Sequence, residues 1–195
     1  MSLDALAADG YALLPAVVPH PDRLLRTVLD EVPWTAQMHS RRTASMGIPY
    51  NYAGASYPEA PWHPAVRALA DAVGERLGFT ATNALLNHYP TGEHTIGWHS
   101  DDTTILAPGT PIAIVSLGAM RTMQLRTATP DADGRFAYTK LPLPSGSLFV
   151  MTAALQATHK HGIKRERGAG ERVSLTFRHL THASEVVTAK RWSER

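Results

Sequence analysis

The sequence predicts a mainly β protein with helices near its N-terminus, an α+β arrangement in which helices buttress a β-sandwich or barrel. Two observations predict this class. Apolar residues recur at helical spacing within the first eighty residues, and after about residue 80 the pattern changes to short runs of strand-forming residues separated by turns. The 195 residues show no internal repeat, low-complexity tract or linker, so we expect a single domain over residues 1–195.

Two helices are expected before residue 80. The segment 20–34 carries an apolar stripe at helical spacing and has a proline suited to its first turn. The segment 63–78 carries a second stripe and ends at Gly78, a residue suited to a helix C-terminus. Between them, residues 41–62 are rich in Gly, Pro, Ser and Tyr and predict a loop with short strands.

Five strands are expected after residue 80, at 84–88, 112–119, 121–127, 147–152 and 172–180. The sequence TPDADGR at 129–135 predicts a hairpin loop, and the proline- and glycine-containing segments 107–111 and 142–146 predict further breaks. Helices first and many short strands afterwards favour the buttressed sandwich or barrel.

The composition limits the chemistry that the chain can perform. It contains no cysteine, which excludes disulfides, thiolate zinc sites, cysteine-ligated iron–sulfur clusters and cysteine nucleophiles. A metal site must therefore use His, Asp or Glu. A net charge of +2 permits a polyanionic partner without requiring one.

The N-terminus lacks a basic segment followed by a long apolar run, so no secretory signal is expected. No apolar segment approaches the roughly 20 residues that cross a bilayer. We expect a cytoplasmic, monomeric protein with no membrane association.

The densest group of chemically capable residues lies in NHYPTGEHTIGWHSDD, residues 87–102. In an extended segment, residues i and i+2 point to the same face, so His99 and Asp101 would project together. With one more histidine they would form the two-histidine, one-carboxylate set typical of non-haem Fe(II). The spacing leaves His159 or His161 as that histidine. On spacing alone, a plain polar strand end is the more common origin of a His-x-Asp pair.

The last predicted strand alternates between apolar and polar residues. Arg172, Ser174, Thr176 and Arg178 would share one face of it. Two arginines lining a pocket would need anionic partners, and a dicarboxylate ligand would satisfy both. The alternative is a solvent-exposed strand with an ordinary charged face.

The ordered segments NHY, IGWHSDD, LAPGTPIAIVSLGAMR, LPLPSGSLFVM, HGI and RVSLTFR resemble those of the AlkB-like Fe(II)/2-oxoglutarate-dependent dioxygenases. The resemblance covers at least residues 42–180 and includes GIPYNYAG and PWHPAVRAL. It implies a double-stranded β-helix (jelly-roll) core at about 81–182. It also implies a helical, substrate-recognising lid region at about 1–80.

The resemblance also implies roles for individual residues. The Fe(II) ligands would be His99, Asp101 and His161, the last because HGI matches the family context, which leaves His159 to line or support the pocket. The 2-oxoglutarate contacts would be Asn87, Tyr89, Arg172, Ser174 and Arg178, with serine at position 174 where the family often has asparagine. The substrate contacts would be Tyr52, Tyr50, Met46 and Thr103. No role is expected for His88 or His94.

The implied reaction is oxidative demethylation of alkylated nucleobases in DNA or RNA, of the 1-methyladenine or 3-methylcytosine type, with release of formaldehyde, succinate and CO2. The candidate phosphate contacts are Arg41, Arg42, Lys160, Lys164, Arg165 and Arg167. Thr103 replaces an acidic residue of the base-repairing relatives, and Met46 and Met123 replace aromatic residues. These changes favour an alternative, a small molecule or modified nucleoside as substrate. A non-enzymatic barrel that kept a metal site is disfavoured by the full set of ligands and arginines.

Overall fold

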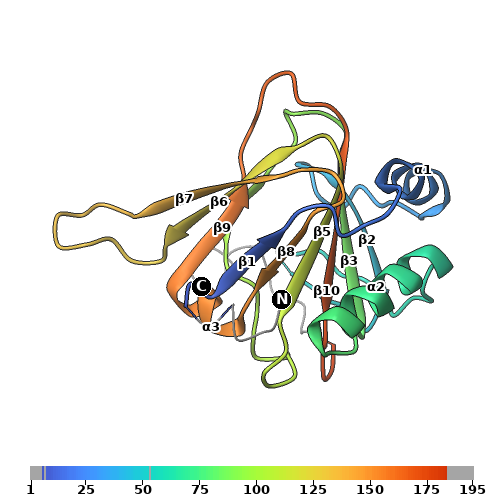
Figure 1. The fold of residues 1–195 in the computed structure, drawn as a ribbon, viewed down its shortest axis with the longest axis horizontal. Helices are drawn as coiled ribbons and strands as arrows, with labels where there is room; N and C mark the ends of the chain where they lie inside the picture. The colour runs from blue at the N-terminus through green and yellow to red at the C-terminus, as the bar shows by residue number, and fades with distance from the viewer. Residues whose placement is uncertain (1–5, 7, 53, 184–195) are drawn as a thin grey trace.

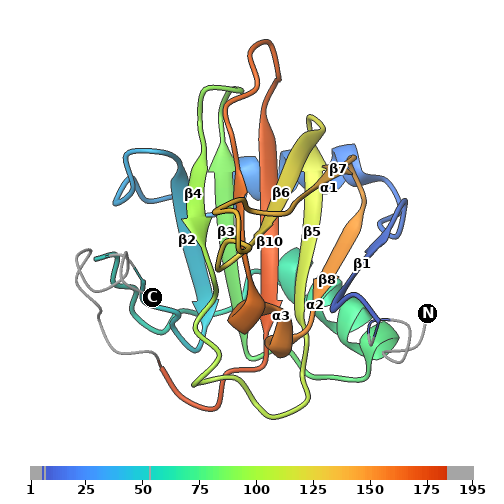
Figure 2. The same ribbon diagram turned by 90° about the vertical axis from the view of Figure 1, so that its left-hand side faces the viewer.

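The computed structural model describes residues 6, 8–52 and 54–183, so the remaining residues of the predicted domain, 1–5, 7, 53 and 184–195, lie outside the described part. The chain folds into two antiparallel sheets (Figure 1). The larger sheet has the order β1 (Tyr11–Leu14), β8 (Leu148–Met151), β5 (Ile112–Gly118), β10 (Arg172–Arg178), β3 (Asn83–Tyr89) and β2 (Arg42–Gly47) (Figure 2). The smaller sheet has the order β4 (Ile96–His99), β9 (His159–Ile163), β6 (Arg121–Thr127) and β7 (Tyr138–Leu143).

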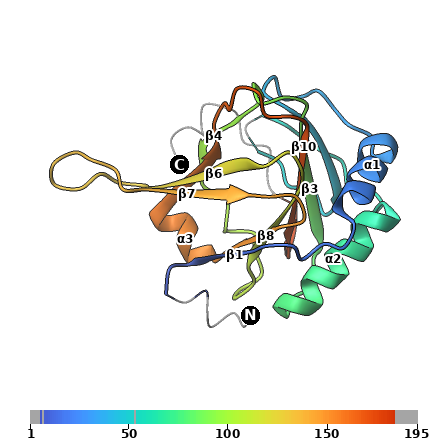
Figure 3. The same ribbon diagram turned by 45° about the horizontal axis from the view of Figure 1, so that its top comes forward.

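The smaller sheet lies across one face of the larger sheet, and helices α1 (Pro21–Glu31) and α2 (Pro64–Leu77) lie on the other face (Figures 1 and 3). A short third helix, α3 (Ala153–Thr158), connects β8 to β9. This is the jelly-roll arrangement of two facing antiparallel sheets, so the predicted fold class is confirmed. No helix in the described part of the chain is long and apolar enough to cross a membrane.

Alternation along the strands divides the core into two layers. On β10, Val173, Leu175 and Phe177 face α1 and α2 and belong to a helix-facing core. A second core lies between the sheets and includes Leu125 of β6 and Phe149 of β8. The helices therefore buttress the larger sheet from outside and leave its inner face for other side chains.

All five predicted strands are present within a few residues of their expected limits, whereas β1, β7, β9 and α3 were not predicted and β4 was expected only as an extended segment at His99 and Asp101. β7 is an edge strand of mostly exposed residues and contains Pro142, which an edge tolerates. β9 has the sequence HKHGI, whose histidines and glycine give no strand signature. Of these two strands, β9 carries His161, which belongs to the candidate metal cluster.

One loop of the N-terminal region crosses to the inner side of the larger sheet. The chain leaves β2 at Gly47 with φ +70°, and a Cβ at this position would collide with the carbonyl of Thr82. The turn directs the following residues, including Tyr50 and Tyr52, into the core between the sheets. Of the region 1–80, this loop reaches the inner face, while α1 and α2 do not.

Candidate active site

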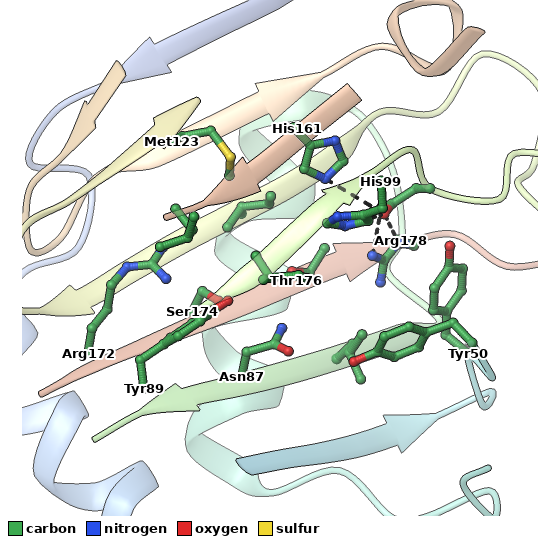
Figure 4. Close-up of a pocket in the computed structure, with 16 residues that line it drawn as sticks. Tyr50, Asn87, Tyr89, His99, Met123, His161, Arg172, Ser174, Thr176 and Arg178 are labelled. Carbon is green, nitrogen blue, oxygen red and sulfur yellow. Dashed lines mark hydrogen bonds and ion pairs between the residues drawn. The ribbon is translucent and has the colours of Figure 1, made fainter. Parts of the chain in front are cut away.

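Two histidines, His99 and His161, lie together between the sheets (Figure 4), and one aspartate, Asp101, converges with them. His99, the last residue of β4, pairs with His161 of β9, and their ring centroids lie 4.2 Å apart. Asp101 follows two residues later, with Oδ1 at 3.6 Å from Nε2 of His99 and 3.9 Å from Nε2 of His161. All three candidate ligand atoms lie within 4.8 Å of one another, so one small cation could contact all of them.

Asp101 reaches this position in a different way from the one expected. Strand β4 ends at His99, so the two residues do not share a regular strand face. The backbone N–H of Asp101 instead donates to Oε1 of Gln156 at 2.8 Å, which fixes the chain as it leaves the strand. The side chains of His99 and Asp101 converge as predicted, but the cause is this hydrogen bond, which fixes the backbone at Asp101, and not the alternation of a regular strand.

The surroundings of the two imidazoles favour their neutral form, which is the form that binds a metal ion. Nδ1–H of His99 donates to the carbonyl of Gly97 at 2.9 Å, which leaves Nε2 free to act as a ligand. Burial lowers the pKa of His99. Burial, together with the neighbouring His99, lowers the pKa of His161 to about 3. Both rings are therefore neutral at neutral pH, as metal ligation requires.

The carboxylate of Asp101 is held from its other side by Arg178. Both Nη2 and Nε of Arg178 donate to Oδ2, at 2.7 and 3.1 Å. Burial would raise the pKa of Asp101, but the charge of Arg178 opposes it, and with the two histidines the pKa falls to about 2. The ring of Tyr50 lies 4.1 Å from the guanidinium, and its hydroxyl accepts a hydrogen bond from the backbone N–H of Asp102 at 2.7 Å. Tyr50 thus supports the ligand-bearing segment.

At the other end of β10 lies an arginine without a carboxylate. Arg172 is 1% exposed, and its Nη2 donates to Oγ of Ser116 at 2.9 Å. Its Nε and Nη1 are buried and have no hydrogen-bond partner among the described residues. A buried guanidinium in this state is costly unless an anion satisfies it. The position therefore suits one carboxylate of a dicarboxylate ligand.

The side chains between Arg172 and the histidines are those expected to contact the co-substrate. Arg172 pairs in register with Tyr89, and Ser174 pairs with Asn87, so all four side chains project from neighbouring positions on the inner face. They line a single cavity together with Thr176, Arg178 and the three candidate metal ligands. This polar face of β10 is buried, so the strand lines a pocket, and the alternative of a solvent-exposed charged face is wrong.

Arg41, expected at the surface as a phosphate contact, lies inside the protein beside the cavity. It is buried, and its Nε donates to Oδ1 of Asn87 at 2.6 Å while Nη2 donates to the hydroxyl of Tyr52 at 2.7 Å. The prediction that Arg41 contacts phosphate is therefore wrong, because its buried guanidinium donates to Asn87 and Tyr52 instead. Arginine can only donate, so the oxygen of Asn87 must face it, and the amide nitrogen turns toward the cavity (Figure 4).

Tyr52 stands at the boundary between the cavity and a second, outer hollow. It lines both, as does His99. Its ring is stacked against that of Tyr57, with centroids 6.5 Å apart and an interplanar angle of 24°. The outer hollow also includes Arg41 and Trp98. A ligand entering through this hollow would contact both Tyr52 and the candidate metal ligand His99.

Two expected substrate contacts are not at the cavity. The prediction that Met46 contacts the substrate is wrong. Met46 pairs with Ala84 on β3, and both residues face the helices. There the sulfur of Met46 accepts a hydrogen bond from the backbone N–H of His63. Alternation puts Ser45, one residue earlier, on the cavity side beside Leu85. Thr103 lies in a turn closed by its carbonyl and the N–H of Leu106, and it lines neither the cavity nor the outer hollow.

The other histidines have separate surroundings. His159 lies beside Thr158 in a hollow on the outside of the molecule, which leaves His161 as the histidine that joins the candidate metal ligands His99 and Asp101. His88 pairs with Glu171 at 2.8 Å, and His94 accepts from the backbone N–H of Thr91 within a turn. Met123 lines the cavity from β6.

Comparison with known proteins defines the class to which this fold and site belong. The family model of the 2OG-Fe(II) oxygenase superfamily matches residues 20–178. The solved structure of OsALKBH1 shares the fold, with a TM-score of 0.62 at 20% identity over 87% of this chain and 96% of that chain. The chain belongs to the 2OG-Fe(II) oxygenase superfamily.

Relatives in sequence narrow this assignment. The human alpha-ketoglutarate-dependent dioxygenase alkB homolog 3 is 33% identical over 196 residues, which cover 91% of this chain and 68% of the human protein. The human DNA oxidative demethylase ALKBH2 is 36% identical over 138 residues, which cover 69% of this chain and 53% of that protein. Within the superfamily, the chain is an AlkB-like Fe(II)/2-oxoglutarate-dependent dioxygenase.

Proposed function

We propose that this dioxygenase demethylates alkylated nucleobases of the 1-methyladenine or 3-methylcytosine type in DNA or RNA, and releases formaldehyde, succinate and CO2. The relative whose name states its activity, DNA oxidative demethylase ALKBH2, supports a nucleic-acid substrate. The observation that carries the proposal is Tyr52, whose ring borders both the outer hollow and the cavity with His99. A flipped-out base needs such an aromatic surface beside the metal.

In this proposal the ligands of Fe(II) are His99, Asp101 and His161, and the contacts of 2-oxoglutarate are Asn87, Tyr89, Arg172, Ser174 and Arg178. The donor set and the unpartnered nitrogens of Arg172 both fit these groups. When bound, Fe(II) and 2-oxoglutarate supply the oxidising chemistry, in which O2 is consumed, succinate and CO2 form, and the N-methyl group is hydroxylated before formaldehyde leaves.

The protein's own part is to orient the reactants. Arg172 binds the distal carboxylate of 2-oxoglutarate, and the amide N–H of Asn87, oriented by Arg41, donates to the same co-substrate. Arg178 holds Oδ2 of Asp101 and so turns Oδ1 toward the two histidines. Tyr52, whose hydroxyl is held by Arg41, presents its ring to the incoming base. The loop that carries Tyr50 and Tyr52 is the part of the N-terminal region that serves as a lid.

A modified nucleoside or another small molecule is the second candidate. The observation that favours it is the lack of a base-edge acid, since Asp101 is the one acidic residue among those that line the cavity and the outer hollow. Relatives that repair bases commonly carry an acid at the position of Thr103.

The test compares polymer and monomer substrates directly. Oligonucleotides carrying 1-methyladenine or 3-methylcytosine, and the corresponding methylated nucleosides, are incubated with the protein, Fe(II), 2-oxoglutarate and O2, and formaldehyde is measured. We expect release from the oligonucleotides. Release from the nucleosides with none from the oligonucleotides would replace the proposal with the small-molecule candidate.

A further inference from the structure

The outer face of the smaller sheet carries positive charge and aromatic rings. Its four strands, β4, β9, β6 and β7, contain no acidic residue. Inward-facing residues on these strands are buried, as Leu125 and His161 are, and the alternate positions point outward. In register across the sheet, Lys160, Arg126 and Tyr138 form an outward row.

The outward-facing side chains contact one another through cation–π and ring–ring interactions. The guanidinium of Arg126 lies 4.1 Å from the ring centroid of Phe136 and 5.2 Å from that of Trp98. The ammonium of Lys164 lies 4.5 Å from Trp98, and the ring of Tyr138 lies 6.0 Å from it. We call this surface the cationic platform, made of Trp98, Arg126, Tyr138, Lys140, Lys160 and Lys164.

The positive charges of the platform are not neutralised within the described part of the chain. None of Arg126, Lys140, Lys160 and Lys164 forms an ion pair with a described carboxylate. The acids of the adjoining loops contact other groups. Glu93 pairs with Arg165 at 2.8 Å, and Glu166 accepts from the backbone N–H of Thr122. In the loop between β6 and β7, Asp133 pairs with Arg135 at 3.5 Å, and Asp131 accepts from the backbone N–H of Arg135. Tyr138 is 59% exposed, so its ring is open to a partner.

The platform is continuous with the entrance to the active site. Trp98 belongs to the platform and also lines the outer hollow, which it shares with Tyr52 and His99. From there the platform extends over β9 and β6 to β7, whose hairpin projects from the body of the molecule on the side opposite α1 and α2 (Figure 1). A polymer whose reacting unit sits at His99 would lie over this surface on one side.

We infer that the cationic platform binds the single-stranded segment next to the target nucleotide, with bases stacked on Tyr138 and Trp98 and phosphates bound by the lysines and Arg126. This inference rests on the proposed function. Rings that accept stacked bases, interleaved with cations that accept phosphates, are what a single strand requires for binding without base-specific contacts. The row of Lys160, Arg126 and Tyr138 supplies both kinds of contact on adjacent strands.

The test measures binding of a fluorescent, unmodified single-stranded oligonucleotide to the full chain over a series of salt concentrations. The double variant Lys140→Glu/Lys160→Glu should bind about tenfold or more weakly, and the slope of log affinity against log salt should fall by about 1.4. Tyr138→Ala should weaken binding about fivefold or more through lost stacking.

Two matched controls keep the comparison specific. Arg23→Glu/Arg76→Glu makes the same charge change at exposed positions on α1 and α2 and should retain binding within about twofold. Met120→Ala removes an apolar side chain that is also 59% exposed, at the turn between β5 and β6, and should have no effect. Circular dichroism establishes that each variant is folded.

Equal losses in the platform and helix variants, or no loss in the platform variants, would overturn the inference. Its failure differs from failure of the proposed function. If the wild type releases formaldehyde from a methylated oligonucleotide while platform variants bind that oligonucleotide normally, the platform is rejected and the function stands. If the wild type neither binds nor oxidises any oligonucleotide, both are rejected.

Discussion

Arg178 and Asp101 form a buried ion pair in which two guanidinium nitrogens, Nη2 and Nε, donate to the same carboxylate oxygen, Oδ2, at 2.7 and 3.1 Å. The other oxygen is left facing His99 and His161. The pair joins the last residue of β10 to a residue just beyond β4, and so couples the two sheets at the candidate metal centre.

Breaking this pair should destabilise the protein. Arg178→Met leaves the carboxylate of Asp101 buried without its cation, and we expect the free energy of unfolding to fall by about 3–5 kcal/mol. The double variant Asp101→Asn/Arg178→Met removes both charges and should recover part of this loss. Urea unfolding of the metal-free proteins measures the free energy of unfolding of the wild type and of both variants. A double variant less stable than Arg178→Met would contradict the pairing.

The two histidines of HKH should differ in metal binding. His161→Ala removes a ligand and should weaken Co(II) or anaerobic Fe(II) binding by at least about 100-fold, more than the loss of a supporting contact. His159→Ala, two residues away on the same strand, is the matched control and should change the affinity less than about twofold. Calorimetric titration checks this, and similar losses in both variants would reject the assignment of His161.

Arg172 should control the affinity for 2-oxoglutarate. Arg172→Gln removes a charged donor to the distal carboxylate, worth about 1.5–3 kcal/mol, so the Kd for 2-oxoglutarate should rise about 10- to 150-fold. Arg172→Lys keeps the charge but not the forked geometry, and its affinity should be intermediate. The exposed Arg42→Gln serves as the control. An unchanged Kd in Arg172→Gln would mean that the co-substrate binds elsewhere.

The neighbours Arg41 and Arg42 should behave very differently. Arg41→Ala frees the amide of Asn87 to rotate and leaves the hydroxyl of Tyr52 without this donor, so the KM for 2-oxoglutarate should rise about tenfold. Arg42→Ala, on the exposed side of β2, should leave that KM unchanged. Steady-state kinetics over a range of 2-oxoglutarate concentrations separates them. Equal KM values for the two variants would show that Arg41 does not position Asn87.

The sequence was most informative where a strand is regular. Alternation alone predicts that the polar residues of β10 share one face and that Asn87 and Tyr89 share another, whereas the pairing of β10 with β3 was not predicted. Asp101 converges with His99 although the strand has ended, through a bond to Gln156 that no local pattern contains. Family resemblance, rather than spacing, selected His161 over His159.

Other features depend on tertiary contacts that the sequence does not express. Arg41 and Arg42 are adjacent and chemically identical, yet one is buried against Asn87 and the other lies at the surface. Met46 was misplaced by one strand position, which moves a side chain to the opposite face of the sheet. The polar strand β9 gave no signature because its side chains serve the site and the surface instead of an apolar core.

The most direct test of the site is an anaerobic titration of the folded protein with Fe(II) and 2-oxoglutarate, followed by visible absorption. We predict a weak charge-transfer band that requires both components, persists in His159→Ala and is lost in folded Asp101→Ala. A folded wild type that shows no band, or a band that survives in Asp101→Ala, would contradict the assignment of His99, Asp101 and His161 as the metal centre.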